Sequence, residues 1–321
     1  MKSVDTRRIL IYIAFSFGLA WLVGLVIYLT GGLVNSPMLV PLLGLNLAAL
    51  LLALGYMPAP AIAHVLTRLV TKEGWKDVYL RPKLARGWPY WAAAWLGPVA
   101  LIIAGGALYF ALFPQHFDPT MAGYLSAVAQ TTPVPEESMA LISNPWFVAG
   151  TGLLTAVIIS PLVNSLFTFG EEFGWRAYLQ PKLMPLGGRR AMLLMGLIWG
   201  VWHWPVILMG HNYGLSYPGA PYLGPLAMTW FTFAAGTFLG WLTLKAESVW
   251  PAVIGHAMIN GMAGLPVLFI TGQPNPILGP LAVGVIGGAF FSLFALLVMI
   301  IPGALPGPQA AAPPETAAAA E

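Results

Sequence analysis

Cysteine is absent from the 321 residues, and charged residues are scarce, since only 8% are Asp, Glu, Lys or Arg. The missing cysteine excludes disulfides, thiolate nucleophiles and Cys-ligated zinc, and it leaves the redox compartment undecided. The scarcity of charge excludes an ordinary soluble domain, in which about 25% of residues are charged. The net charge of +3 is too small to indicate nucleic-acid binding.

Hydrophobic residues make up 58% of the chain, which is typical of an integral membrane protein. A hydrocarbon core of about 30 Å needs roughly 20 apolar residues per helix, so the chain has room for about eight spans and little else. We therefore expect an all-α polytopic fold with one transmembrane domain over residues 1–302 and a motif-bearing core over 146–270. The Ala/Pro-rich residues 303–321 are predicted to be a disordered tail.

Apolar runs separated by polar or Pro/Gly-rich breaks predict the individual helices. The first apolar run is too long for a signal peptide and is expected to be a retained helix. Residues 170–184 are expected to continue the fourth helix along the membrane interface. The predicted spans are about 9–30, 38–57 (continued to 70 after a Pro break), 88–113, 146–169, a fifth after Arg189 and Arg190, 225–244, 249–270 and 278–301.

The distribution of positive charge predicts the topology. All 14 Lys and Arg residues lie at the N-terminus or in the connections after the second, fourth and sixth spans. Cytoplasmic loops carry an excess of Lys and Arg, so both termini are predicted to lie on the cytoplasmic side of the cell membrane. Glu171 and Glu172 are expected on that same side.

Two adjacent carboxylates end the long apolar run of the fourth span. Burying a carboxylate without a partner is costly, and ionisable groups within membrane spans usually mark a functional site. Glu172 and Arg176 are four residues apart on a helix and can pair along one face. Glu171 projects about 100° away and is free to point elsewhere. The structural alternative is a surface ion pair at a helix end.

Two later spans bring further polar pairs at the same spacing. Trp199 and His203 share one helix face, with Trp202 beside them, and His256 and Asn260 share another. The structural alternatives are a histidine satisfied by a backbone carbonyl and hydrogen bonding between helices. His203 is expected roughly 20 Å from the basic end of its helix, deeper than Glu171, and tilt or a water-filled cavity would reconcile the two depths.

Together these groups suit hydrolysis of an amide bond. A carboxylate and a histidine can take a proton from water, and a second histidine with an amide can stabilise an oxyanion. Glu171, His203 and His256 could instead bind zinc, although no His-Glu-x-x-His motif is present. A proton-coupled transporter is disfavoured because no internal repeat is visible. His211 is expected to be solvated in an outer loop.

The ordered motifs resemble those of the type II CAAX prenyl endoprotease family, which includes the Ras-converting endoprotease. The resemblance rests on Glu171-Glu172-x-x-x-Arg176, Trp199-x-x-x-His203 and His256-x-x-x-Asn260, about 90 residues. It implies an intramembrane endopeptidase with a cavity open to the cytoplasm. By analogy Glu171 and His203 activate water, His256 and Asn260 form the oxyanion site, and Glu172 and Arg176 support them. The family usually has Phe at the position of Trp199, so cavity shape can differ here.

The resemblance implies a membrane-associated peptide or protein substrate, prenylated or not, cleaved near its C-terminus within the lipid bilayer. A mechanism without a metal cofactor is favoured over a zinc-dependent one. The competing class is a non-catalytic membrane protein, such as a bacteriocin-immunity factor. Trp199 and Trp202 are expected to line the substrate cavity.

Overall fold

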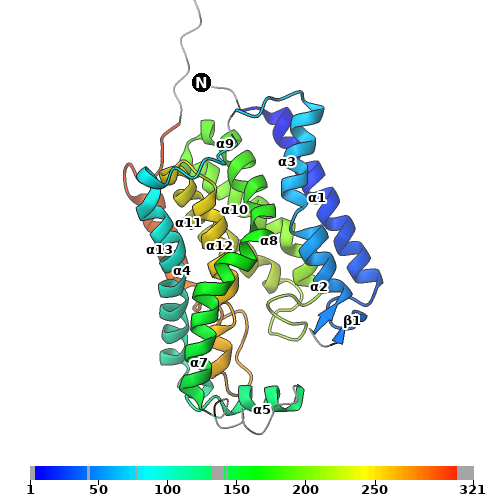
Figure 1. Cartoon of the computed structure of the whole chain (residues 1–321), viewed down its shortest axis with the longest axis vertical. Helices are drawn as coiled ribbons and strands as arrows, with labels where there is room; N and C mark the ends of the chain where they lie inside the picture. The colour runs from blue at the N-terminus through cyan, green and yellow to red at the C-terminus, as the bar shows by residue number, and fades with distance from the viewer. Residues whose placement is uncertain (1–3, 42–43, 77, 132–140, 142–143, 309–321) are drawn as a thin grey trace, which may run out of the picture.

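The computed structural model describes residues 4–41, 44–76, 78–131, 141 and 144–308. These residues form a bundle of helices with one short two-stranded hairpin (Figure 1). Within this described part, seven helical segments are long and apolar enough to cross a bilayer, and an eighth apolar helix, α13, has 12 residues. The predicted all-α multi-pass membrane fold is therefore confirmed.

In chain order the larger elements are α1 (Thr6–Leu29), β1 (Met38–Val40), β2 (Leu45–Asn46), α2 (Leu47–Leu51), η2 (Leu52–Tyr56), α3 (Ala59–Val70), α4 (Leu84–Leu112), α5 (Ala122–Thr131), α7 (Pro145–Leu154), η4 (Thr155–Ile159), α8 (Ser160–Gly174), η5 (Trp175–Leu179), α9 (Gln180–Leu183), η6 (Met184–Leu186), α10 (Gly188–Leu208), α11 (Leu223–Ala246), α12 (Trp250–Met262), η7 (Leu265–Phe269) and α13 (Ala289–Ile300).

The second span begins later than the sequence predicts. Residues 38–46 contain the β1–β2 hairpin, and the helical span runs over 47–70. Pro37 and Pro41 lack the N–H groups that a helix interior needs, and Gly44 has a φ of 61°. The chain therefore turns back here before it becomes helical at Leu47.

The fourth span does not end at Phe169. One helical run extends from Pro145 to Leu186 and includes two π-helical turns, η4 and η5. Such turns are frequent at functional sites, and η5 begins immediately after the Glu171–Gly174 segment. The prediction that residues 170–184 continue the fourth helix is therefore confirmed, but this stretch does not lie along a surface, since Glu171, Glu172 and Arg176 are buried inside the bundle.

The eighth helix begins at Ala289 and not near Leu278. The backbone from Leu278 to Gly288 is irregular and folds back on itself, so that a Cβ at Gly287 would lie 2.1 Å from the carbonyl oxygen of Leu281. Only a residue without a side chain fits there. Non-helical backbone at membrane depth is tolerated where it is buried in protein or lines a cavity, and Leu281 lines one.

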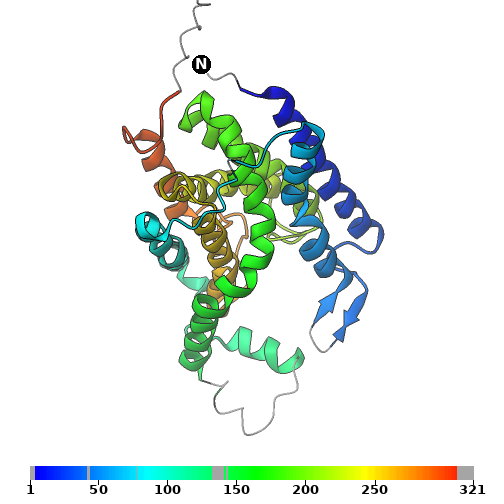
Figure 2. The same ribbon diagram turned by 45° about the horizontal axis from the view of Figure 1, so that its top comes forward.

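The helices pack around α10, α11 and α12. α10 packs against α11, α12 lies between α8 and α4, and α1 packs on α3, which packs on α8 (Figure 2). Gly196 and Gly200 on α10 allow a very close approach, since a Cβ on Gly200 would lie 2.6 Å from the Cα of Thr229 on α11. Small residues four apart are a typical contact between membrane helices.

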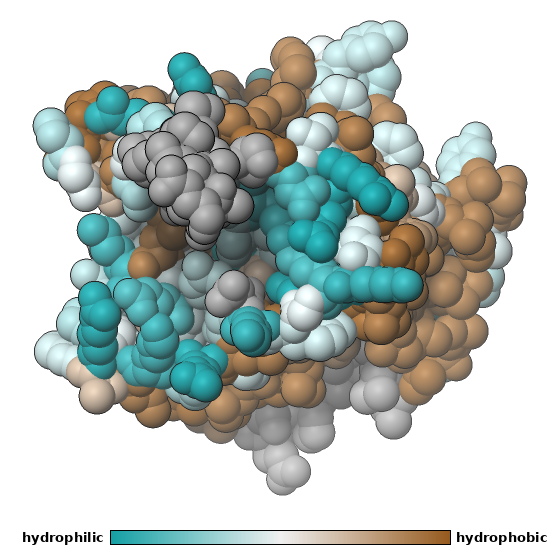
Figure 3. Space-filling model, turned by 90° about the horizontal axis from the view of Figure 1, so that it is seen from above, coloured by the Kyte–Doolittle hydropathy of each residue, from teal (hydrophilic) through white to brown (hydrophobic). Residues whose placement is uncertain are grey.

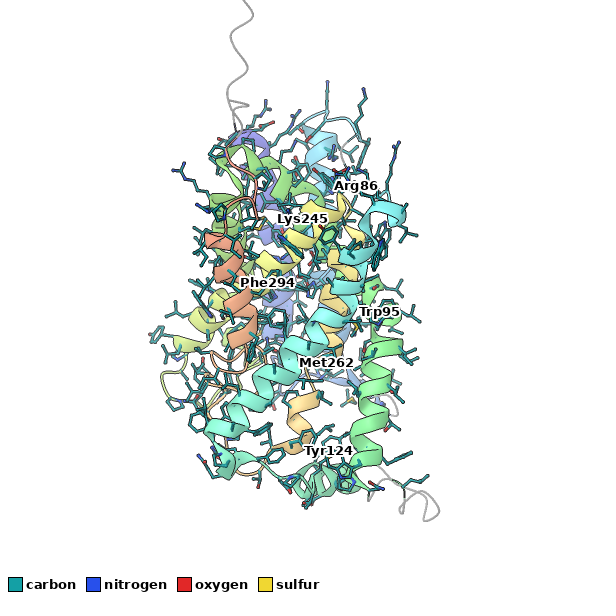
Figure 4. All side chains as sticks on the ribbon, turned by 90° about the vertical axis from the view of Figure 1, so that its left-hand side faces the viewer. Arg86, Trp95, Tyr124, Lys245, Met262 and Phe294 are labelled. Carbon is teal, nitrogen blue, oxygen red and sulfur yellow. The ribbon has the colours of Figure 1, made fainter. Side chains whose placement is uncertain are left out.

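The basic connections gather at one end of the bundle. Arg86 and Lys245 lie there, whereas Tyr124 lies at the opposite end (Figure 4). Viewed onto the basic end, hydrophilic side chains surround the middle of the surface and apolar ones occupy the flanks (Figure 3). The assignment of this end to the cytoplasm stays a prediction. Most of the predicted disordered tail, residues 309–321, lies outside the described residues.

Candidate active site

Three helices bring the predicted polar residues to one cavity of about 330 Å³. α8 contributes Glu171, α10 contributes the Trp199 motif, and α12 contributes the His256 motif. All six predicted catalytic and cavity residues line this space: Glu171, Trp199, Trp202, His203, His256 and Asn260. The structure therefore joins motifs that are separated by up to 90 residues of sequence.

The continuous helix from Pro145 to Leu186 removes the difference in depth that the sequence suggested. Glu171 precedes Leu186 by fifteen residues, and His203 follows Gly188, the start of α10, by the same interval. At the rise of an α-helix both lie about 22 Å from the basic end of their helices. The expectation of a shallow Glu171 is wrong, and both side chains reach one level of the bundle.

Glycines flank the acidic pair and let α8 pack tightly on α3. A Cβ on Gly170 would lie 2.8 Å from the Cα of Pro58, and one on Gly174 would lie 2.5 Å from the carbonyl carbon of Pro60. This contact closes the α3 side of the helix that carries the pair. Glu171 is 3% exposed, and Glu172 is fully buried.

Glu172 forms a buried ion-pair network beneath the cavity. Its Oε1 accepts a hydrogen bond from Arg176 Nη1 at 2.9 Å, which confirms the pairing that the spacing predicts. The same oxygen lies 2.8 Å from His256 Nδ1. Arg176 is also fully buried, so the alternative of a surface ion pair at a helix end is wrong.

Glu171 points away from this network, into the cavity. Its Oε2 accepts a hydrogen bond of 2.9 Å from the indole nitrogen of Trp199. Glu171 and Glu172 thus face different partners although they are adjacent in sequence. The carboxylate of Glu171 is the one that borders the open space.

The hydrogen bonds of the two histidines define which ring nitrogen carries a proton. His203 Nδ1 lies 2.8 Å from the backbone carbonyl oxygen of Trp199, and a carbonyl only accepts. His203 Nδ1 is therefore the donor, and its Nε2 is an acceptor when the ring is neutral. His256 Nδ1 faces the Glu172 carboxylate, which accepts hydrogen bonds, so this ring nitrogen is also the donor.

Asn260 completes the set on α12. Its side chain is exposed, borders the cavity and has no hydrogen-bond partner among the described residues. An amide with free donors beside the space can bind a developing oxyanion. The local helix geometry places it one turn beyond His256, as the spacing predicts.

The sequence did not point to several other lining residues. Tyr56 packs against Trp202 and donates a hydrogen bond to its carbonyl oxygen. His211 and Asn212 also line the cavity, so the expectation that His211 is simply solvated is incomplete. No regular spacing links these residues to the three motifs. Only the packing of the second span and of the loop after α10 brings them here.

The cavity reaches the surface away from the basic end. His211 and Asn212 are exposed lining residues, and they follow the end of α10 that is remote from Arg189 and Arg190. None of the described lysines or arginines lines the cavity. These exposed lining residues lie away from the basic end, whereas the resemblance implied a cavity that opens on the basic, cytoplasmic side.

The zinc alternative would require Glu171, His203 and His256 to hold one ion together. Across the described ranges, no group of three His, Cys, Asp or Glu side chains is placed to hold a metal ion. We therefore derive no step through a bound metal.

Comparisons with known proteins agree with the motifs. Residues 145–262 match the family model described as type II CAAX prenyl endopeptidase Rce1-like. CAAX prenyl protease 2 from Methanococcus maripaludis is 29% identical over 92 residues, which is 28% of this chain and 34% of that protein. The alignment thus spans about a third of the length of this curated relative. The match over residues 145–262 and this distant relative together support an Rce1-like type II CAAX prenyl endopeptidase domain in this part of the chain.

Proposed function

We propose that the protein is an intramembrane endopeptidase that hydrolyses a peptide bond near the C-terminus of a membrane-associated substrate. The observation that carries this proposal is the convergence of Glu171, His203, His256 and Asn260 on one cavity. The family match supports the class of reaction. The apolar residues around these four groups suit a substrate that resides in the bilayer.

In the proposed reaction, a water molecule binds between Glu171 and His203. The free oxygen of the Glu171 carboxylate takes one proton from it, and Nε2 of neutral His203 accepts a hydrogen bond that orients it. The water oxygen attacks the scissile carbonyl carbon and forms a tetrahedral oxyanion. Glu171 then returns the proton to the leaving nitrogen as the C–N bond breaks. The products are a carboxylic acid and an amine, and the acid then gives the remaining proton of the water to the amine, which leaves a carboxylate and an ammonium group.

His256 and Asn260 bind the oxyanion. Because His256 Nδ1 already donates to Glu172, its Nε2 can donate to the oxyanion only when the ring is doubly protonated. The Glu172 carboxylate is the counter-ion that this imidazolium needs. The buried ion pair with Arg176 holds that carboxylate in place. This assigns Glu172 and Arg176 a supporting role.

The proposal is tested with purified protein in lipid nanodiscs and a fluorescence-quenched peptide that ends in Cys-a-a-X with an S-farnesyl cysteine. Glu171→Gln, His203→Ala and His256→Ala should each lower kcat by at least about 100-fold, as expected for loss of a base or an oxyanion donor. The unprenylated peptide, assayed in parallel, shows whether the lipid group is required.

Matched controls come from residues outside the cavity. His116→Ala removes a partly exposed histidine that does not line the cavity, and Glu247→Gln removes a carboxylate that pairs with Lys83 and Arg86. Both variants should retain turnover within about threefold. Unaltered turnover by Glu171→Gln would refute the hydrolytic proposal and favour a non-catalytic membrane protein.

A further inference from the structure

Trp199 contacts each of the groups that the proposed reaction uses around the water. Its indole nitrogen donates to Glu171 Oε2 at 2.9 Å, and its backbone carbonyl accepts from His203 Nδ1 at 2.8 Å. Its ring meets the His256 ring edge-on, with 5.4 Å between the ring centres. The guanidinium of Arg176 lies 4.4 Å from the centre of the indole ring. Trp199 itself is 3% exposed.

We propose that Trp199 is a positioning residue that fixes the Glu171 carboxylate relative to His203, in addition to lining the cavity. This inference rests on the proposed function. A glutamate side chain has several rotatable bonds, and a charge-assisted hydrogen bond from a rigid indole restricts them. The bond occupies Oε2 and leaves the other oxygen of Glu171 to take the proton.

The indole is itself held in place, which is what a positioning role requires. The Arg176 guanidinium packs on its ring and is bound to Glu172 at the same time. Gly236 on α11 leaves room for this stack, since a Cβ there would lie 3.2 Å from Arg176 Nη2 and 3.5 Å from the indole ring. Trp199 therefore contacts both the Glu172–Arg176 ion pair and the proposed base, Glu171.

This role is specific to a tryptophan. A phenylalanine ring at this position would have no N–H group. With phenylalanine the backbone bond to His203 would remain, but the bond to Glu171 could not form. The proposed role of Trp199 therefore depends on its indole nitrogen, which donates to Glu171.

Trp204 provides a matched control on the same helix. Its indole nitrogen donates to Thr229 Oγ1 at 3.1 Å, and the residue does not line the cavity. Trp204→Phe therefore removes an equivalent hydrogen bond and an equivalent volume away from the site. A general effect of losing an indole from α10 would appear in both variants.

The kinetic test compares Trp199→Phe, Trp204→Phe and a protein with 3-benzothienylalanine at position 199, assayed on the farnesylated peptide. The last residue keeps the shape of the indole but lacks the N–H donor. We expect kcat to fall about 10- to 100-fold for both changes at position 199, with KM changed less than about threefold, because a misplaced base slows the chemical step. Trp204→Phe should stay within about threefold of the unaltered protein. Unaltered kcat with benzothienylalanine would overturn the proposal.

A second measurement does not need turnover. In protein labelled with ¹⁵N-tryptophan, the indole proton of Trp199, assigned with Trp199→Phe, should resonate downfield and move upfield in Glu171→Ala. The Trp204 signal should not move. An unchanged Trp199 signal in Glu171→Ala would overturn the positioning role. Retained turnover by Glu171→Gln would instead refute the proposed function, so the two failures are distinguishable.

Discussion

The buried pair of Glu172 with Arg176 makes a strong prediction about stability. In Glu172→Gln the amide has the shape of the carboxylate and its oxygen can still accept hydrogen bonds, but the negative charge is lost. Both donors now bond to one oxygen, Oε1. Arg176 is fully buried, so its cation would lose the anion with which it forms an ion pair in the described structure. Breaking such a pair costs about 3–5 kcal/mol.

The double variant Glu172→Leu with Arg176→Met separates the charge effect from a packing effect. It removes both charges and fills the space with apolar atoms, so most of the lost stability should return. Turnover should not return, because His256 Nδ1 would lack its acceptor. The free energy of unfolding in bicelles and kcat on the farnesylated peptide are the two measurements.

The result that would refute this reasoning is specific. If Glu172→Gln unfolds within about 1 kcal/mol of the unaltered protein, the pair does not carry the energy of a buried ion pair. If the double variant is less stable than Glu172→Gln, packing rather than unpaired charge explains the loss. Either outcome would also weaken the supporting role assigned to Glu172.

Three further predictions concern other parts of the molecule. Burial raises the pKa of Glu73, but its hydrogen bond and ion pair with Lys182 outweigh this and hold the pKa below its usual range. Its contribution to stability is then present above the unfolded-state pKa of about 4.3 and is lost as the pH falls through the lowered folded-state pKa. Glu73→Gln should therefore cost at most about 1 kcal/mol at neutral pH, after solvent screening, and nothing in acid, as measured by chemical unfolding at several pH values. Gly200→Ala would place a Cβ 2.6 Å from the α11 backbone and should destabilise by about 1–3 kcal/mol. Gly18→Ala, whose Cβ meets no atom within 4 Å, should change thermal unfolding little. Treatment with a chelator followed by metal analysis should leave turnover of the farnesylated peptide unchanged, and activity restored only by added zinc would contradict the proposed mechanism.

Local sequence signals predicted the spans well where the apolar run was uninterrupted. The third span, expected at 88–113, runs from Leu84 to Leu112, and the sixth, expected at 225–244, runs from Leu223 to Ala246. Hydropathy reports transfer into the bilayer, which depends only on the residues themselves. Hydropathy predicted helix wrongly at 38–46 and 278–288, because proline and glycine there impose a backbone geometry that apolar composition does not report.

The helical spacing also predicted which partner Glu172 has, because residues four apart share a helix face whatever the rest of the fold does. It separated Glu171 from Arg176 for the same reason. It could not predict that His256, 84 positions further on, bonds to Glu172. That contact depends on how α12 packs against α8.

The sequence alone thus determined the membrane class, most of the spans and the three polar motifs, since each follows from composition or from the period of one helix. Tertiary structure decided the depth and environment of the acidic pair. The carboxylates of Glu171 and Glu172 meet Arg176, His256 and Trp199 inside the bundle. Burial of charge depends on partners from distant segments, and no local pattern records where those segments meet.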